Sequence, residues 1–119
     1  MATHNDLGRL GESLAVGYLL ENNYVILERN WRFQKAEIDI IAKKEAQIII
    51  IEVKTRNSNF FGDPQSFVSP EKIKLLLKAA NQYLVSNNIP LEARFDILAI
   101  IKNKSTQEIT HFKDAFYHF

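Results

Sequence analysis

The sequence predicts an α/β fold in which two helices cover a mixed β-sheet. Two segments with helical spacing of apolar residues lie at 6–22 and 70–87, and five strand-like segments lie between and after them. The first three strands follow one another through short turns, so we expect them to be antiparallel neighbours. The second helix is a crossover, which makes the third and fourth strands parallel neighbours.

Length and composition restrict the class of protein. The chain has 119 residues, and residues 1–119 are predicted to form one domain. It has no cysteine, which excludes disulfides, thiolate zinc sites and a thiol nucleophile. No apolar run approaches the roughly 18 residues that a membrane span needs, and no signal-peptide pattern opens the chain. We therefore expect a cytoplasmic protein with no membrane contact.

The first helix, residues 6–22, contains three glycines within an apolar stripe. Each of Gly8, Gly11 and Gly17 costs about 1 kcal/mol relative to alanine in a helix interior. Such glycines indicate close approach of the backbone, here to the sheet or to a phosphate. Glu12 follows Gly11, and by its spacing alone it is a solvent-facing glutamate, with a third acid of a site as the alternative.

Three strand candidates follow at residues 24–32, 35–43 and 47–55. The third contains four consecutive isoleucines, which predicts a strand buried on both faces near the middle of the sheet. This apolar run stops at Glu52. Because strand side chains alternate, Glu52 and Lys54 share one face, and Arg56 follows on it.

The second strand carries Asp39, which a hairpin around residues 43–47 brings near Glu52 at the strand ends. Carboxylate oxygens at this spacing suit Mg²⁺, which binds a few carboxylates together with water and phosphate. A lysine beside them, here Lys54, can hold a phosphate or favour the ionised form of the attacking water. The alternative is a Glu–Lys ion pair next to an edge carboxylate.

Residues 57–69 show no periodicity and follow the third strand directly, next to this predicted site. A loop of this length inside a compact domain is usually functional or mobile. Its aromatic residues Phe60, Phe61 and Phe67 suit stacking on unpaired bases. The alternative is that they fix the loop to the core.

The second helix is expected to start at Ser69 as the cap and Pro70 as the first helical residue. Its apolar stripe is predicted to consist of Ile73, Leu76, Leu77, Ala80 and Leu84. Three lysines, Lys72, Lys74 and Lys78, lie off this stripe. Lys74 and Lys78 are one turn apart and suit contact with a phosphate backbone, with a solvated basic face as the alternative.

Two further strands are predicted at residues 95–101 and 107–112. Arg94 and Asp96 flank the start of the first of them and are interpreted as paired structural charges. The aromatic tail at 115–119 is expected to pack down or to join a partner chain. The histidines show no metal-ligand spacing, so none is given a role.

Glu52-x-Lys54 follows the carboxylate of Asp39 by thirteen positions. This is the spacing of the PD-(D/E)xK nuclease motif. Over nearly its whole length the chain resembles the YraN family, small bacterial proteins of that superfamily that are similar in fold to archaeal Holliday junction resolvases. The matching pieces are Gly11-Glu12, Asn30, Glu37-Ile38-Asp39, Glu52-Val53-Lys54-Thr55-Arg56, Gly62, Lys72, Arg94-Phe95-Asp96 and Ala115-Phe116. The family usually has a glycine where this chain has Ala36.

The resemblance implies a restriction-endonuclease-like αβββαβ core and a metal-dependent nuclease that hydrolyses phosphodiester bonds of DNA, including branched or repair intermediates. The implied catalytic residues are Glu12, Asp39, Glu52 and Lys54. Mg²⁺ or Mn²⁺ would be bound by Asp39, Glu52 and the carbonyl of Val53. Nucleic-acid contacts are expected from Arg56, Lys72, Lys74 and Lys78. The likeness to resolvases also leads us to expect a homodimer.

Two other classes of function remain open at this point. One is a non-catalytic nucleic-acid-binding module that retains the nuclease fold, and the other is a protein-interaction subunit that uses the aromatic tail. The formal net charge of +1 gives no general basic surface, which counts against a nucleic-acid role. If Glu12, Asp39 and Glu52 face a metal, their three negative charges are set aside and the rest of the chain carries +4.

Overall fold

We analysed a computed structural model, which describes residues 4–57 and 68–116. Its elements are α1 (His4–Glu21), β1 (Val25–Phe33), β2 (Ala36–Lys44), β3 (Gln47–Arg56), α2 (Pro70–Ser86), β4 (Ala93–Lys102) and β5 (Gln107–Phe112). The predicted order of helices and strands is confirmed, and the bounds differ from the prediction by only a few residues. The predicted stacking residues Phe60, Phe61 and Phe67, and the last three residues of the tail, lie outside the described ranges.

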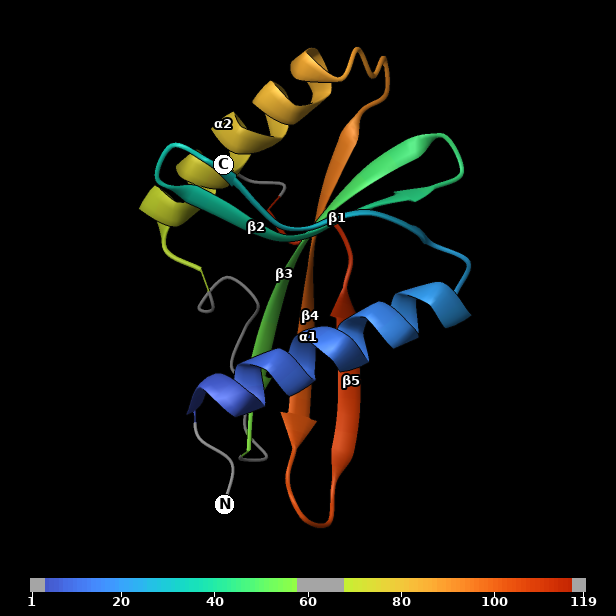
Figure 1. The fold of residues 1–119 in the computed structure, drawn as a ribbon, viewed down its shortest axis with the longest axis vertical. Helices are drawn as coiled ribbons and strands as arrows, with labels where there is room; N and C mark the ends of the chain where they lie inside the picture. Colours follow the sequence, from blue (N-terminus) through green and yellow to red (C-terminus); the bar gives the residue numbers. More distant parts are fainter. Residues whose placement is uncertain (1–3, 58–67, 117–119) are drawn as a thin grey trace.

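The sheet has the strand order β1-β2-β3-β4-β5. β3 and β4 are parallel, and the other neighbouring pairs are antiparallel, as predicted. In Figure 1, α1 and α2 lie on opposite sides of the sheet. Neither helix within the described part of the chain combines the length and apolar content that crossing a membrane requires.

Each face of the sheet packs on its own apolar core. Ile48 and Ile50 belong to the core beneath α2, whereas Ile49 and Ile51 belong to the core beneath α1. All four isoleucines are at most 2% exposed. The isoleucine run therefore forms a strand buried on both faces, which fixes the direction in which the following residues, from Glu52 onward, project.

The start of α2 is fixed by its cap. The Ser69 hydroxyl accepts a hydrogen bond from the backbone N–H of Lys72, at 3.1 Å, and Pro70 is the first helical residue. The predicted apolar stripe is confirmed in part, because Leu77 is 38% exposed while Tyr83 is buried. Each helical residue turns by about 100°, so Leu77 lies on the flank of the stripe rather than at its centre.

Of the three glycines of α1, Gly11 lies against the sheet. A Cβ atom built at Gly11 would lie 2.8 Å from both Cβ and Cγ2 of Thr55 on β3. The prediction of close backbone approach is thus confirmed at Gly11. Close approach to the sheet is wrong at Gly8 and Gly17, where such an atom would meet nothing within 4 Å among the described residues.

The C-terminal segment packs against the sheet, as one of the two alternatives expected. Ala115 and Phe116 are buried, and the Phe116 ring lies 6.0 Å from that of Phe95. The backbone N–H of Ala115 donates a hydrogen bond to the carbonyl of Phe95, at 2.7 Å.

The sheet opens between β2 and β3. Their pairing runs from Lys44–Gln47 to Ile40–Ile51 and goes no further. Beyond that point β2 stays paired with β1, and β3 stays paired with β4 as far as Arg56, so the two strands diverge (Figure 1). We call this divergence, between Asp39 on β2 and Glu52 on β3, the fork.

Candidate active site at the fork

Asp39 faces β3 across the fork. Its Oδ2 atom accepts a hydrogen bond from the backbone N–H of Val53, at 2.8 Å. Val53 lies two residues beyond Ile51, the last residue of β3 that pairs with β2. The Asp39 side chain therefore takes the place of a backbone carbonyl of β2. A carboxylate is thereby held beside Glu52, the residue that precedes Val53.

The environment of Asp39 disfavours its negative charge. Burial is the largest cause and the Glu52 charge the second, and together with Glu12 they raise the pKa of Asp39 to about 7. The hydrogen bond from Val53 and the charge of Lys72 oppose this rise. The carboxylates of residues 39 and 52 are therefore neighbours, as the sequence predicted.

Glu52 is a buried acid with two ammonium groups on one of its oxygens. It is 4% exposed. Its Oε1 atom lies 2.6 Å from Nζ of Lys72 and 3.7 Å from Nζ of Lys54. The Lys54 contact was expected from the sequence, whereas the shorter contact comes from a lysine that was predicted only as a nucleic-acid contact.

The third acid, Glu12, reaches the fork from α1. The close approach of Gly11 to Thr55 seats this part of α1 on β3, and the Glu12 charge acts on the Asp39 carboxyl group. Spacing along the helix favoured a solvated glutamate. Oε1 of Glu12 is instead buried, and it has no hydrogen-bond partner among the described residues.

A second carboxylate oxygen is in the same condition. Oε2 of Glu52 is buried and accepts no hydrogen bond from residues 4–57 or 68–116. Leaving a buried carboxylate oxygen without a partner costs about 1–3 kcal/mol or more. Two such oxygens, from Glu12 and Glu52, near the half-buried Asp39 are expected where an unseen cation or solvent supplies the missing interaction.

The chemistry of these oxygens fits Mg²⁺ or Mn²⁺. Carboxylates are the hard ligands that Mg²⁺ prefers, and Mg²⁺ usually takes one or two of them together with water and substrate phosphate. In the part of the chain that the structure describes, no group of three or more His, Asp or Glu side chains is placed so that together they could hold a metal ion. The arrangement therefore fits an open site, in which Asp39 and Glu52 would be the ligands and much of the coordination would come from water and substrate.

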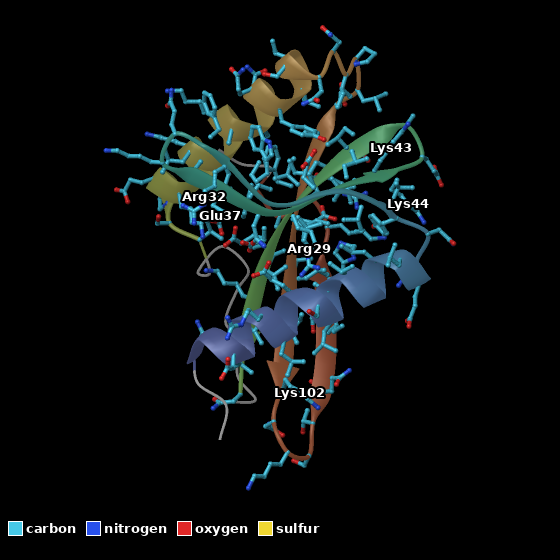
Figure 2. The ribbon with its side chains drawn as sticks, viewed as in Figure 1. Arg29, Arg32, Glu37, Lys43, Lys44 and Lys102 are labelled. Carbon is cyan, nitrogen blue, oxygen red and sulfur yellow. The ribbon has the colours of Figure 1, made fainter. Side chains whose placement is uncertain are left out.

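A cavity of about 540 Å³ borders the fork. Asp39 and Lys72 line it, together with Ser69, Glu71, Leu75, Leu76, Ala36, Lys35, Glu37 and Arg32. Arg32 and Glu37 form an ion pair of 2.7 Å, and Figure 2 shows them next to each other beside the start of α2. The cavity thus joins the acids of the fork to a rim that carries cationic side chains.

The other three predicted nucleic-acid contacts are exposed side chains. Lys74 and Lys78 are exposed, and at about 100° per residue Lys74 lies roughly 200° around α2 from Lys72. Arg56 is exposed at the end of β3. Lys72 touches Glu52 at the fork. A nucleic-acid contact stays a prediction for all four residues.

A second buried polar cluster lies on the α1 side of the sheet, around Asp96 of β4. Asp96 is fully buried and forms a two-point ion pair with Arg94, at 2.9 and 2.7 Å. His111 Nε2 lies 2.7 Å from Oδ2 of Asp96, and its Nδ1 lies 3.0 Å from the Tyr18 hydroxyl. The interpretation of Arg94 and Asp96 as paired structural charges is confirmed.

The charges of this cluster stabilise one another. Burial by itself would raise the pKa of Asp96, but hydrogen bonds from His111, Arg94 and the backbone N–H of Asp114 hold that pKa below its usual range. The hydrogen bond to Asp96 in turn raises the pKa of Arg94. No pattern in the sequence indicates the role of His111, because its partner Asp96 lies on another strand, fifteen positions earlier.

The strand order, the parallel β3–β4 pair and the helix on each face define an α/β protein with a nuclease-like αβββαβ core. The profile described as "Uncharacterised protein family UPF0102" matches residues 11–100. The chain belongs to this family, which is the YraN family of the sequence prediction.

Relatives cover the chain from end to end. A UPF0102 protein of Flavobacterium psychrophilum is 60% identical over 119 residues, which is all of both chains. One of Christiangramia forsetii is 54% identical over the same length. One of Bacteroides thetaiotaomicron is 44% identical over 117 residues, which is 98% of this chain and 97% of the relative.

Proposed function

We propose that this protein is a metal-dependent nuclease that hydrolyses phosphodiester bonds of DNA, with branched or repair intermediates as the expected substrates. The observation that carries the proposal is the meeting of Glu12, Asp39 and Glu52 at the fork with two buried, unpartnered carboxylate oxygens. These acids come from three separate elements, and the charges of Glu52 and Glu12 help to raise the pKa of Asp39. An acid with a raised pKa beside other acids is typical of functional sites.

The residues have separate roles in this proposal. Asp39 and Glu52, with the carbonyl of Val53, hold Mg²⁺ or Mn²⁺, and Glu12 assists from α1. When bound, such an ion supplies Lewis-acid polarisation of the phosphodiester and a lowered pKa of water. Lys54 orients the attacking water and stabilises the negative charge that grows on the phosphate. The motif holds no serine, cysteine or tyrosine, so the attack by water is direct and leaves no covalent enzyme intermediate.

The binding partners and the location follow from the same proposal. The substrate is DNA, the assembly is a homodimer like that expected from the resemblance to resolvases, and the protein acts in the cytoplasm. Arg56, Lys74 and Lys78 contribute contacts to phosphates outside the fork.

The proposal is tested by incubating the protein with linear, flap and four-way-junction DNA in Mn²⁺. Asp39→Asn is the most informative variant, because the amide oxygen can still accept the Val53 hydrogen bond while the charge is lost. Asp114→Asn is the matched control, because it removes one carboxylate from an exposed residue outside the fork. We expect cleavage by the wild type and by Asp114→Asn only.

Two results would contradict nuclease activity. One is cleavage that Asp39→Asn retains in full, and the other is no cleavage of any substrate. In the second case, salt-sensitive DNA binding that Asp39→Asn retains would favour the alternative of a non-catalytic nucleic-acid-binding module.

A further inference from the structure

The shortest ion pair at the fork joins Lys72 of α2 to Glu52 of β3. Its 2.6 Å length contrasts with the 3.7 Å that separates Lys54 from the same Oε1 atom. Glu52 is almost fully buried, and a buried carboxylate needs a cation or hydrogen-bond donors to remain ionised. Lys72 is the closer of the two cations.

The two partners differ in exposure. The side chain of Lys72 is 41% exposed, whereas that of Glu52 is 4% exposed. The ammonium group can therefore leave for solvent without breaking the core, while the carboxylate stays fixed in β3. The Arg94–Asp96 pair is the opposite case, because both partners are largely buried and joined by two hydrogen bonds.

The position of Lys72 offers it a second partner. Its side chain lines the cavity that also contains Asp39. The Ser69 cap fixes the first turn of α2 and with it the place from which the lysine extends. An ammonium group that leaves Glu52 thus remains beside the fork, on the wall that a phosphodiester substrate would face.

Glu52 itself has capacity for another cation. Its Oε2 atom is buried with no partner in the described residues, so Lys72 satisfies only one of the two oxygens. Two cations cannot share the buried carboxylate without repulsion, so a divalent ion that binds Glu52 competes with Lys72.

We propose that Lys72 is an exchangeable counter-ion: it holds Glu52 in place while no divalent cation is bound, leaves when one binds, and then contacts the substrate phosphate. This inference rests on the proposed nuclease function and adds an order of events to it. Lys72 is accordingly a positioning residue in the cation-free protein, and it becomes a phosphate contact only after the cation is bound.

The test is Mn²⁺ binding to the full chain without nucleic acid, measured by calorimetry on the wild type, Lys72→Met and Lys54→Met. Both variants remove one positive charge near the same carboxylate, but only Lys72→Met removes the 2.6 Å contact. We expect Lys72→Met to bind Mn²⁺ roughly tenfold more tightly than the wild type. Lys54→Met should change the affinity clearly less.

Thermal unfolding gives a second measurement. Lys72→Met should melt at a lower temperature than the wild type without metal, because Glu52 loses its closest cation. Saturating Mn²⁺ should raise its melting temperature by more than it raises that of the wild type. If Lys72→Met does not fold, Lys72→Gln replaces it in the Mn²⁺ measurements. The double variant Glu52→Gln, Lys72→Met serves the metal-free measurement only, where it should recover the stability that Lys72→Met loses.

Three outcomes would overturn the inference. Equal Mn²⁺ affinities of Lys72→Met and Lys54→Met would mean that Lys72 acts on metal binding only as a nearby positive charge. Lower stability with unchanged Mn²⁺ affinity would make it a structural ion pair only. In both cases metal-dependent cleavage by the wild type would leave the proposed function intact. A wild type that binds no Mn²⁺ would overturn this inference and the metal dependence of the proposed function together.

Discussion

Asp39 accepts a hydrogen bond from the backbone N–H of Val53 at the position where β2 and β3 separate. One carboxylate therefore does two things: it ends the β2–β3 ladder without leaving an unsatisfied amide, and it lies next to Glu52. A backbone carbonyl in the same place would satisfy the amide equally well. The side chain adds a negative charge that the ladder does not need, which connects this strand end to the chemistry of the fork.

The raised pKa of Asp39 predicts how stability depends on pH in the metal-free protein. Its pKa is about 7 when folded and near 3.8 when unfolded, so the folded state binds the proton more tightly. The free energy of unfolding should be greatest near pH 4, where Asp39 is protonated in the folded state. It should fall as the pH rises from about 4 to about 7, and level off above that. The loss should be a few kcal/mol, because each tenfold change in proton affinity corresponds to about 1.4 kcal/mol.

Urea unfolding between pH 5 and 8 measures this effect, with Asp39→Asn as the comparison. The variant should show a much flatter profile. Asp96 does not interfere, because its pKa is lowered and its contribution is lost only at more acidic pH. Equal slopes for the wild type and Asp39→Asn would contradict the raised pKa.

Gly11→Ala should destabilise the protein by about 1–3 kcal/mol, because the new methyl group would overlap the Thr55 side chain. Gly8→Ala is the matched control in the same helix. It meets open space and should stabilise by up to about 1 kcal/mol. Chemical denaturation of both variants checks the prediction, which fails if the two substitutions have the same sign.

Asp96→Asn should cost about 3–5 kcal/mol, because it leaves the Arg94 guanidinium without its charged partner. Tyr18→Phe removes only the hydroxyl contact to His111 and should cost about 1 kcal/mol. Mn²⁺ affinity of both variants should equal that of the wild type under conditions where they are folded. A change in that affinity would mean that this cluster and the fork are coupled.

Glu12→Gln should lower the rate of DNA cleavage by roughly 100-fold, the lower end of the usual effect of a positioned acid or base. Glu21→Gln is the matched control, because it removes one exposed carboxylate from the other end of α1. Single-turnover kinetics in saturating Mn²⁺ measures both variants. If Glu12→Gln cleaves as fast as Glu21→Gln, then Glu12 plays no part in the reaction.

Much of the fold follows from local patterns in the sequence. The run of residues 48–51 is apolar at every position, and its β-branched isoleucines favour a strand buried on both faces over a buried helix. The helix after it makes the next strand parallel. The nearness of Asp39 and Glu52 follows from the hairpin between their strands. Both inferences need only the connections between neighbouring elements and the alternation of side chains along each strand.

The contacts that the sequence did not predict depend on packing between distant elements. Lys72 reaches Glu52 because Ile73 and Leu76 set the rotation of α2 on the sheet, and the lysine alone carries no sign of this. His111 reaches Asp96 through the register in which β5 pairs with β4. The spacing of Glu12 along α1 likewise cannot show that Gly11 lets the helix lie close to Thr55.

The parallel pairing of β3 with β4 also sets the order in which the sheet can form during synthesis of the chain. β3 has one neighbour, β2, as soon as residue 56 has left the ribosome, but its other neighbour ends only at Lys102. A nascent chain that stops before β4 therefore carries all three acids on an incomplete sheet, with half of the β3 backbone unpaired. The sheet on the β4 side of the fork can be completed only after β4 has been translated.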